Sequence, residues 1–335
     1  ENFDQGGAIP DATNTKITKT NSMRFGAYAQ DLISITDQFK ALVGLRWSWQ
    51  EAEVTTEDLT KDPIETNVSD KRIDQAFTPK VGLVYQPTKN IALFTSYSNS
   101  FTPNSGTTVD LEALKPSIID QFEVGIKNDF WKGLLTTNVT FYQIQNNNLA
   151  QTAEFKADGS PNTDSSIKVL SGATKSKGVE FDVTACPVQG LHIMAGYSYN
   201  DMRYTKTSGL KGSFIEGDRL VRTPVNTANF SFFYTLQNGS LKGLSFGALA
   251  VYTGKRIAGW NNQIDPDKPN GINDRAIPIN DYTTIDASIG YNWKKFSLLC
   301  KISNITDVLN YTIHENYSVN PIAPRQFTGT LKYTF

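Results

Sequence analysis

The chain ends on the stretch "APRQFTGTLKYTF", Ala323–Phe335. Read alternately, it divides into an apolar face of Phe327, Gly329, Leu331, Tyr333 and Phe335 and a polar face of Gln326, Thr328, Thr330, Lys332 and Thr334. Side chains alternate between faces with a period of two along a β-strand. The stretch therefore predicts a strand that lies between two different environments. Chain termini are usually poorly ordered, whereas this predicted strand runs to the final aromatic residue.

The same alternation recurs upstream of this stretch. It is found in "ALVGLRWSW" (41–49), "QFEVGIKNDF" (121–130), "GVEFDVTA" (178–185) and "TIDASIGYNW" (284–293). Short connections at 34–38, 86–90, 129–133, 186–190, 236–240 and 292–295 alternate with long polar ones at 55–72, 102–117, 146–174, 205–220, 258–281 and 309–322. This spacing predicts an all-β, antiparallel up-and-down meander with one loop-rich end and one trimmed end.

Composition restricts the class of protein. The chain has 335 residues, 39% of them hydrophobic, and a formal net charge of −1. That charge gives no electrostatic reason to expect nucleic acid as a partner. No run of about 18 apolar residues is present, which excludes a membrane-spanning helix. Membrane strands alternate, and their average hydrophobicity is modest, so a transmembrane β-barrel remains compatible with the composition.

Two features favour a transmembrane barrel over a soluble β-sandwich or another soluble all-β binding module. The predicted strands are long, about ten residues or more, and the asymmetry between long and short connections has no reason to exist in a sandwich. In a barrel the apolar faces meet lipid, where a Lys or Arg would cost about 2–4 kcal/mol at mid-bilayer. The polar faces then line a wet lumen with Arg46, Lys80, Glu123, Lys127, Glu180, Asp182, Asp286 and Lys301. We expect these charges to pair across the wall rather than to bind a ligand.

The predicted hairpins give about 13 strands, whereas single-chain bacterial barrels have even strand numbers. An open sheet edge in lipid would leave backbone groups without partners. We therefore expect residues 21–335 to be the C-terminal portion of a larger barrel and residues 1–20 to be the remnant of an extracellular loop.

Several segments, in order, resemble strands of the TonB-dependent siderophore receptors. They are "FGAYAQDLISITDQFKALVGLRW", "FTPKVGLVYQPTKNIALFTSYSNSFTPNSG", "LKPSIIDQFEVGIKNDFW", "SKGVEFDVTACPVQGLHIMAGYSYND", "LVRTPVNTANFSFFY", "AVYTGKRIAG", "NITDVLNY" and "PRQFTGTLKYTF". The resemblance implies a 22-stranded barrel with an N-terminal plug domain; no plug or TonB-interacting segment is visible in this sequence. It also implies the outer membrane of a Gram-negative bacterium, import of a ferric siderophore and a TonB complex that acts through the missing N-terminal part. In that family the outer-membrane assembly machinery reads the terminal strand, which would give Leu331, Tyr333 and Phe335 the role of an assembly signal.

The sequence says less about the transported ligand than about the fold. The alternatives are a TonB-dependent importer of cobalamin, haem or a glycan, and a passive or structural outer-membrane barrel. Ligand specificity belongs to the long connections, whose aromatic and amide side chains suit a ferric siderophore. The candidate ligand-binding residues, placed by topology alone, are Phe101, Asn104, Tyr204, Trp260, Asn261, Asn262, Tyr311, His314 and Tyr317. The alternative role of each is packing within a loop or in an interfacial belt.

The sequence carries no signature of an enzyme. It has two His and two Cys, no GxSxG and no HExxH, and we expect no Cys–His pairing, catalytic residue, cofactor or structural metal. The segment "DPDKPNGIND" (265–274) departs from the EF-hand order and predicts a solvated loop. Cys186 and Cys300 are expected to be free thiols at strand ends.

Overall fold

The computed structural model describes residues 14–110, 112–170, 172–207, 209, 211–265, 271–314 and 318–335, the side chains of residues 314, 318 and 319 excepted. Over these ranges the chain forms β-strands joined by turns and irregular connections. Within the same ranges, no helix has the length and apolarity needed to cross a membrane.

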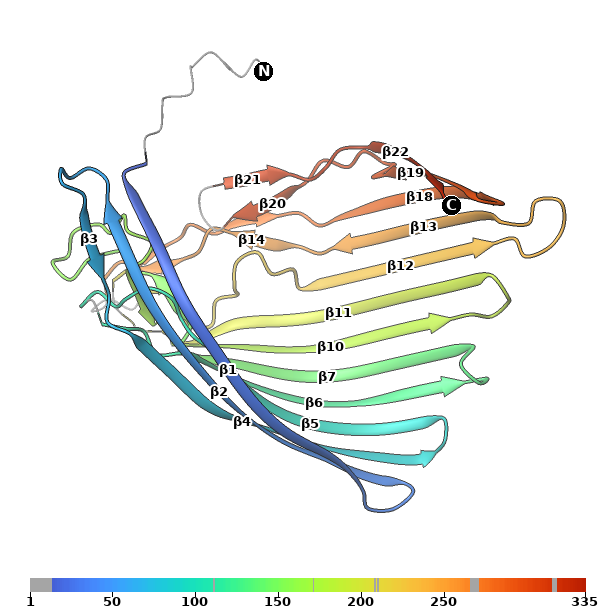
Figure 1. Cartoon of the computed structure of the whole chain (residues 1–335), viewed down its shortest axis with the longest axis horizontal. Helices are drawn as coiled ribbons and strands as arrows, with labels where there is room; N and C mark the ends of the chain where they lie inside the picture. Colours follow the sequence, from blue (N-terminus) through green and yellow to red (C-terminus); the bar gives the residue numbers. More distant parts are fainter. Residues whose placement is uncertain are drawn as a thin grey trace, which may run out of the picture. The chain divides into compact units, whose positions relative to one another are not determined.

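The strands fall into one large sheet and several small ladders (Figure 1). The large sheet contains β1 (Lys16–Ser34), β2 (Phe39–Asp58), β3 (Glu65–Val68), β4 (Arg72–Thr88), β5 (Ile91–Thr102), β6 (Ser117–Phe130), β7 (Leu135–Asn147), β10 (Ala173–Ala185), β11 (Leu191–Lys206), β12 (Asn226–Thr235), β13 (Leu244–Thr253), β18 (Tyr282–Trp293), β19 (Phe296–Ser303) and β22 (Gln326–Tyr333). The ladders pair β8 (Ala150–Thr152) with β9 (Lys168–Leu170), β14 (Arg256–Ala258) with β17 (Ile277–Ile279), β15 (Asn262–Gln263) with β16 (Ile272–Asn273), and β20 (Tyr311–His314) with β21 (Ser318–Pro321).

The order of the large sheet confirms the predicted meander. Thirteen of its strands follow one another from β1 to β22 with sequential neighbours, and β3 pairs with β2 beside this path. The pairings from β4 to β22 whose registers are defined are antiparallel. Five of the six predicted short connections are short turns, whereas the connection between β12 and β13 is longer than predicted and runs over residues 236–243. The small ladders lie in the predicted long connections, except that β14 begins at Arg256, just before one of them. β1 begins at Lys16, inside the segment 1–20 that we expected to be a loop remnant.

The chain divides into two compact units, each with its own contacts. Unit 1 consists of Glu1–Ala29 and Leu45–Thr78. In it, Phe25 and Trp47 meet edge to face at 5.8 Å, and the Lys19 ammonium lies 2.6 Å from Glu57. Unit 2 consists of Gln30–Gly44 and Pro79–Phe335 and carries most of the long connections. Every site discussed below lies in unit 2.

The strands of unit 2 present an exposed apolar face, as the alternation predicted. Val124 lies opposite Phe141, and Phe141 lies opposite Val179, so apolar side chains of successive strands share one face. Phe141 is 56% exposed, and Leu331 of the last strand is 70% exposed. A soluble sandwich would bury such a face, whereas a membrane barrel turns it to lipid.

The opposite face carries charges that find partners within the wall. The Lys301 ammonium lies 2.8 Å from the Asp286 carboxylate. Ser96 donates a hydrogen bond of 3.2 Å to Glu123, and the Lys127 ammonium lies 5.1 Å from the centre of the Phe94 ring. These contacts support the structural role that was predicted for the polar face.

The trimmed end of the last three strands carries a row of aromatic rings. Tyr333 lies 4.9 Å from Phe296 and 5.1 Å from Phe335, and Trp293 stacks on Phe296 at 6.3 Å. Aromatic rings gather at membrane interfaces in this way.

The prediction that both thiols lie at strand ends is wrong for Cys300. This residue lies inside β19, opposite Ile289, because β19 continues past it to Ser303.

Candidate functional site

The buried hydrophobic side chains of the described chain gather in the long connections and at the strand ends that lead into them. They are Leu114, Ala153, Ala173, Tyr204, Phe214, Ala258 and Ile313. The strands themselves form a single layer with little apolar core of their own. The loop end of unit 2 is therefore where the chain builds enclosed, defined surfaces, which a binding site requires.

A cluster of three rings lies at the centre of this region. Tyr204, at the end of β11, stacks on Phe214 with ring centres 4.2 Å apart. Phe214 meets Trp260 edge to face at 5.5 Å, and the Arg275 guanidinium lies 5.4 Å from the centre of the Trp260 ring. Tyr204 is 4% exposed and Phe214 is 8% exposed. We call Tyr204, Phe214, Trp260 and Arg275 the aromatic cluster.

Backbone pairing between two long connections holds the aromatic cluster in place. Gly212 donates its N–H to the carbonyl of Gln263 at 2.7 Å, and Gln263 donates to the carbonyl of Ser213 at 3.0 Å. Gly212 has a φ of +84°, and a Cβ at this position would lie 2.8 Å from the Cβ of Glu154. A glycine is therefore required here both for the backbone conformation and for the approach of a third loop.

Glu154 ties that third loop to the aromatic cluster. Its carboxylate accepts a hydrogen bond of 2.9 Å from Asn262 and lies 3.8 Å from the Arg275 guanidinium. Asn261 donates to the Asp218 carboxylate at 3.1 Å and accepts from the backbone N–H of Arg275 at 3.1 Å. Residues from three long connections are thus joined by charged and amide groups around one set of rings.

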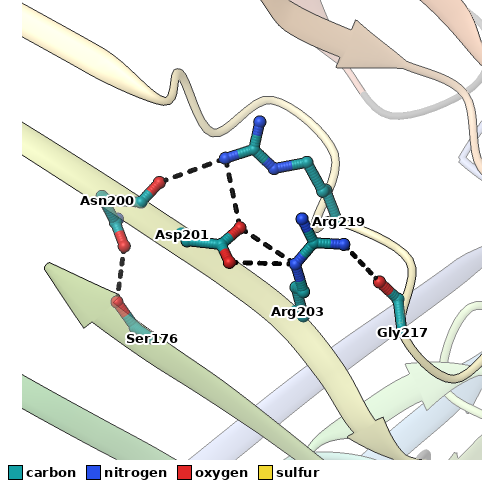
Figure 2. A network of polar contacts seen from close by, with 6 residues as sticks. All are labelled: Ser176, Asn200, Asp201, Arg203, Gly217 and Arg219. Atoms are coloured by element: carbon teal, nitrogen blue, oxygen red, sulfur yellow. Dashed lines mark hydrogen bonds and ion pairs between the residues drawn. The ribbon is translucent and has the colours of Figure 1, made fainter.

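Figure 2 shows a charge network around Asp201. Arg203 donates from Nε to both oxygens of Asp201 at 3.0 Å, and the guanidinium of Arg219 lies 3.3 Å from the same carboxylate. Arg203 also donates to the carbonyl of Gly217 at 2.8 Å. A second carboxylate, that of Asp218, also lies close enough to interact with Arg203, so two cations face two anions here.

A cavity of about 160 Å³ joins the charge network to the aromatic cluster. Its lining includes Arg203, Tyr204, Asp218, Arg219, Trp260 and Asn261. Among the described residues, the buried Trp260 Nε1 and Arg275 Nε have no hydrogen-bond partner. Buried donors of this kind are uncommon in native proteins and mark a place where an acceptor belongs. The arrangement can therefore hold a ligand that offers oxygen acceptors and a flat or apolar surface.

The connection between β8 and β9, which also contains Glu154, carries a fixed negative charge at its tip. Asp158 accepts hydrogen bonds from the Ser160 hydroxyl at 2.6 Å and from its backbone N–H at 2.9 Å. These bonds favour the carboxylate and hold the pKa of Asp158 below its ordinary value. The tip is therefore anionic at neutral pH.

The structure brings four of the predicted ligand-binding residues together: Tyr204, Trp260, Asn261 and Asn262. The amide of Asn104 donates to the carbonyls of Lys115 and Asn148, so it braces two loops. Phe101 lies in β5 opposite Ile118, and the carbonyl of Tyr311 accepts a hydrogen bond from Arg256. His314 ends β20 without a described side chain, and Tyr317 lies outside the described residues. Of the 265–274 loop, Asp267 and Asn270 also lie outside them.

The sequence did not identify Phe214, Arg275 or Glu154 as part of this region. Their only signal was a lone aromatic or charged residue within a polar loop, which does not reveal its partners. The expectation of no Cys–His pairing is wrong, because the Cys186 thiol and His192 Nδ1 lie 3.3 Å apart. The tight turn between β10 and β11 places these two residues opposite each other.

Comparison with known proteins gives a consistent family assignment. A family model described as "TonB dependent receptor-like, beta-barrel" matches residues 2–305. The chain is 25% identical to the metal-pseudopaline receptor CntO of Pseudomonas aeruginosa over 308 residues. This alignment covers 91% of this chain and 40% of that protein. It is 27% identical to the ferrioxamine B receptor of Salmonella typhimurium over 90% of this chain and 39% of that protein. The chain thus spans about 40% of the length of these curated relatives.

Solved structures show the same fold. The siderophore receptor PiuA from Acinetobacter baumannii superposes with a TM-score of 0.73 at 21% identity, covering 94% of this chain and 44% of that one. The two chains therefore share the barrel architecture over nearly the whole of this sequence. The relatives carry the names of receptors and transporters.

Proposed function

Because this chain belongs to the TonB-dependent receptor-like β-barrel family, we propose that it forms the C-terminal wall and ligand-facing loops of an importer of ferric siderophores. The chain is part of a β-barrel in the outer membrane of a Gram-negative bacterium. The proposed role is transport rather than catalysis. In the proposed mechanism, a plug domain and a TonB complex, both acting through parts of the protein outside this sequence, supply the energy for release.

The observation that carries the proposal is the pair of buried N–H donors without acceptors beside the loop-end cavity. Trp260 Nε1 and Arg275 Nε lie on the aromatic cluster, and Trp260 also lines the cavity. Ferric siderophores present oxygen-rich, anionic ligand groups around iron, together with flat or apolar organic parts. Donors in a partly dry site bind such oxygens more strongly than donors in water.

The two guanidinium groups of the network around Asp201 support the same class of ligand. Arg203 and Arg219 line the cavity, together with the carboxylate of Asp218. Guanidinium groups donate charge-assisted hydrogen bonds to the oxygens of an anionic ligand, and these bonds are stronger than bonds between neutral groups. The cavity of about 160 Å³ is small for a whole siderophore, so we assign it to one arm of the ligand.

The relatives' names support a metallophore as cargo and leave the metal open. One relative is named as a receptor for metal-pseudopaline and another as a receptor for ferrioxamine B. A strain that lacks the gene should be grown on single defined metallophores, each loaded with iron, nickel or zinc. We expect the deletion to abolish growth on one ferric siderophore and to spare the others.

Two outcomes would contradict the proposal. The first is unchanged use of every ferric siderophore by the deletion strain, with loss of growth on haem or cobalamin instead. The second is rapid swelling of liposomes that contain the intact protein, at the rate of an open pore. That result would identify a passive diffusion barrel.

A further inference from the structure

At the trimmed end of unit 2, far along β11 from the aromatic cluster, a thiol and an imidazole are in contact, and a thioether lies two residues further along the same strand. β10 ends at Ala185, β11 begins at Leu191, and Ala185 pairs with Ile193. This register puts Cys186 opposite His192, and the Cys186 sulfur lies 3.3 Å from His192 Nδ1. Met194 follows on the same face of β11 as His192, since residues two apart on a strand share a face.

The concentration of these residue types is unusual for this chain. The whole sequence holds 2 Cys, 2 His and 3 Met. One of each lies within the nine-residue hairpin segment 186–194. A methionine normally fills a core, whereas Met194 is 54% exposed. Its register partner on β10 is Thr184, and Thr184 shares a face with Asp182, one of the charges of the polar face.

The spacing fits one metal ion. With the bond lengths of zinc sites, about 2.3 Å to sulfur and 2.0 Å to nitrogen, two ligands of one ion lie roughly 3.5 Å apart. The observed separation of Cys186 Sγ and His192 Nδ1 is 3.3 Å. The Cα atom of Met194 lies roughly 6.6 Å along the strand from that of His192. The Met side chain has three rotatable bonds, so its sulfur can turn toward His192 on the same face of the strand.

The face is also open to solution. His192 is exposed and Cys186 is half-buried. The imidazole and the thioether are therefore accessible from solution, and the thiol lies beside the imidazole.

We propose that Cys186, His192 and Met194 form a binding site for a soft monovalent metal ion, copper(I). Thiolate, imidazole and thioether groups together favour copper(I) over hard cations such as Mg²⁺ or Ca²⁺. We assign the thioether of Met194 as the third ligand, and it is the ligand that favours a soft metal ion. This site is independent of the proposed siderophore function.

The test is a competition for copper(I) between the purified intact protein and a coloured copper(I) chelator, under anaerobic, reducing conditions. We expect one copper(I) ion per chain, with Cys186→Ser lowering the affinity by about 100-fold and His192→Gln or Met194→Leu by about 10-fold each. Met194→Leu conserves volume and apolarity, so its effect reports the sulfur alone. X-ray absorption of the loaded protein should show mixed sulfur and nitrogen ligation.

Two matched variants make the result specific. Met202→Leu changes another methionine on the same face of β11, opposite Ser176 in the register, and Cys300→Ser removes the other thiol. Both should leave copper(I) affinity unchanged. Full affinity in Cys186→Ser, an equal loss in Cys300→Ser, or an unchanged affinity in Met194→Leu would overturn the proposed ligand set.

Discussion

Replacing Phe214 by Ala should open the loop end of the barrel without unfolding the wall. Phe214 is 8% exposed and contacts Tyr204 at 4.2 Å and Trp260 at 5.5 Å. Truncating a buried Phe to Ala costs about 3–5 kcal/mol, of which each ring pair contributes about 0.5–1.5 kcal/mol. Since about 1.4 kcal/mol is a factor of ten in an equilibrium constant, opening of these loops should become about 100-fold more frequent or more.

Hydrogen exchange of the intact protein measures this opening directly. The amides of Gly212 and Gln263, which pair the two loops, should lose about 100-fold or more of their protection. The amides of β6 and β7 should keep theirs. Phe181→Ala is the matched control, because Phe181 is 41% exposed on the apolar face and lies in β10. Equal protection of Gly212 and Gln263 in wild type and Phe214→Ala would refute the idea that this ring holds the loops together.

Three further substitutions test other parts of the structure. Leu331→Asp should reduce the amount of folded, heat-modifiable barrel in the outer membrane. Leu331 is 70% exposed, and a charge at a lipid-facing position costs up to about 2 kcal/mol and interrupts the predicted assembly signal. Thr330→Asp, on the other face of β22, should assemble normally, and equal assembly of the two variants would contradict the assignment of Leu331 to the lipid face. Arg256→Leu should loosen the connection before β18 and the one after β19 by about 3 kcal/mol, since the buried guanidinium donates to the Asn310 side chain and the Tyr311 carbonyl. Unchanged proteolysis of these loops would argue against this role. Trp260→Phe keeps the ring contact and removes Nε1, so ligand affinity should fall by about 10-fold with normal loop protection, and an unchanged affinity would remove this donor from the proposed site.

The alternation of side chains predicted the wall closely. It gave the turn at residues 129–133 between β6 and β7, and the pairing of apolar faces across β6, β7 and β10. A period of two is a local property of the chain, and short turns leave little choice of neighbour. Strand order therefore followed from the sequence alone.

The loop end could be predicted only by position. The pattern of long connections predicted that Tyr204 and Trp260 lie at the loop-rich end, where the structure has them. Their link through Phe214 depends on pairing between Gly212 and Gln263, which are about 50 positions apart. Such long-range contacts leave no periodic signal. The Cys186–His192 contact was missed for a different reason: it depends on the register of one hairpin, which the turn geometry sets.

The most direct test of the central claim is uptake of radioactive iron by the deletion strain complemented with the intact gene. Iron supplied as its ferric siderophore should accumulate in complemented cells, and accumulation should stop when TonB is absent or the proton gradient is collapsed. Accumulation that continues without TonB and without the gradient would contradict energised import through this barrel.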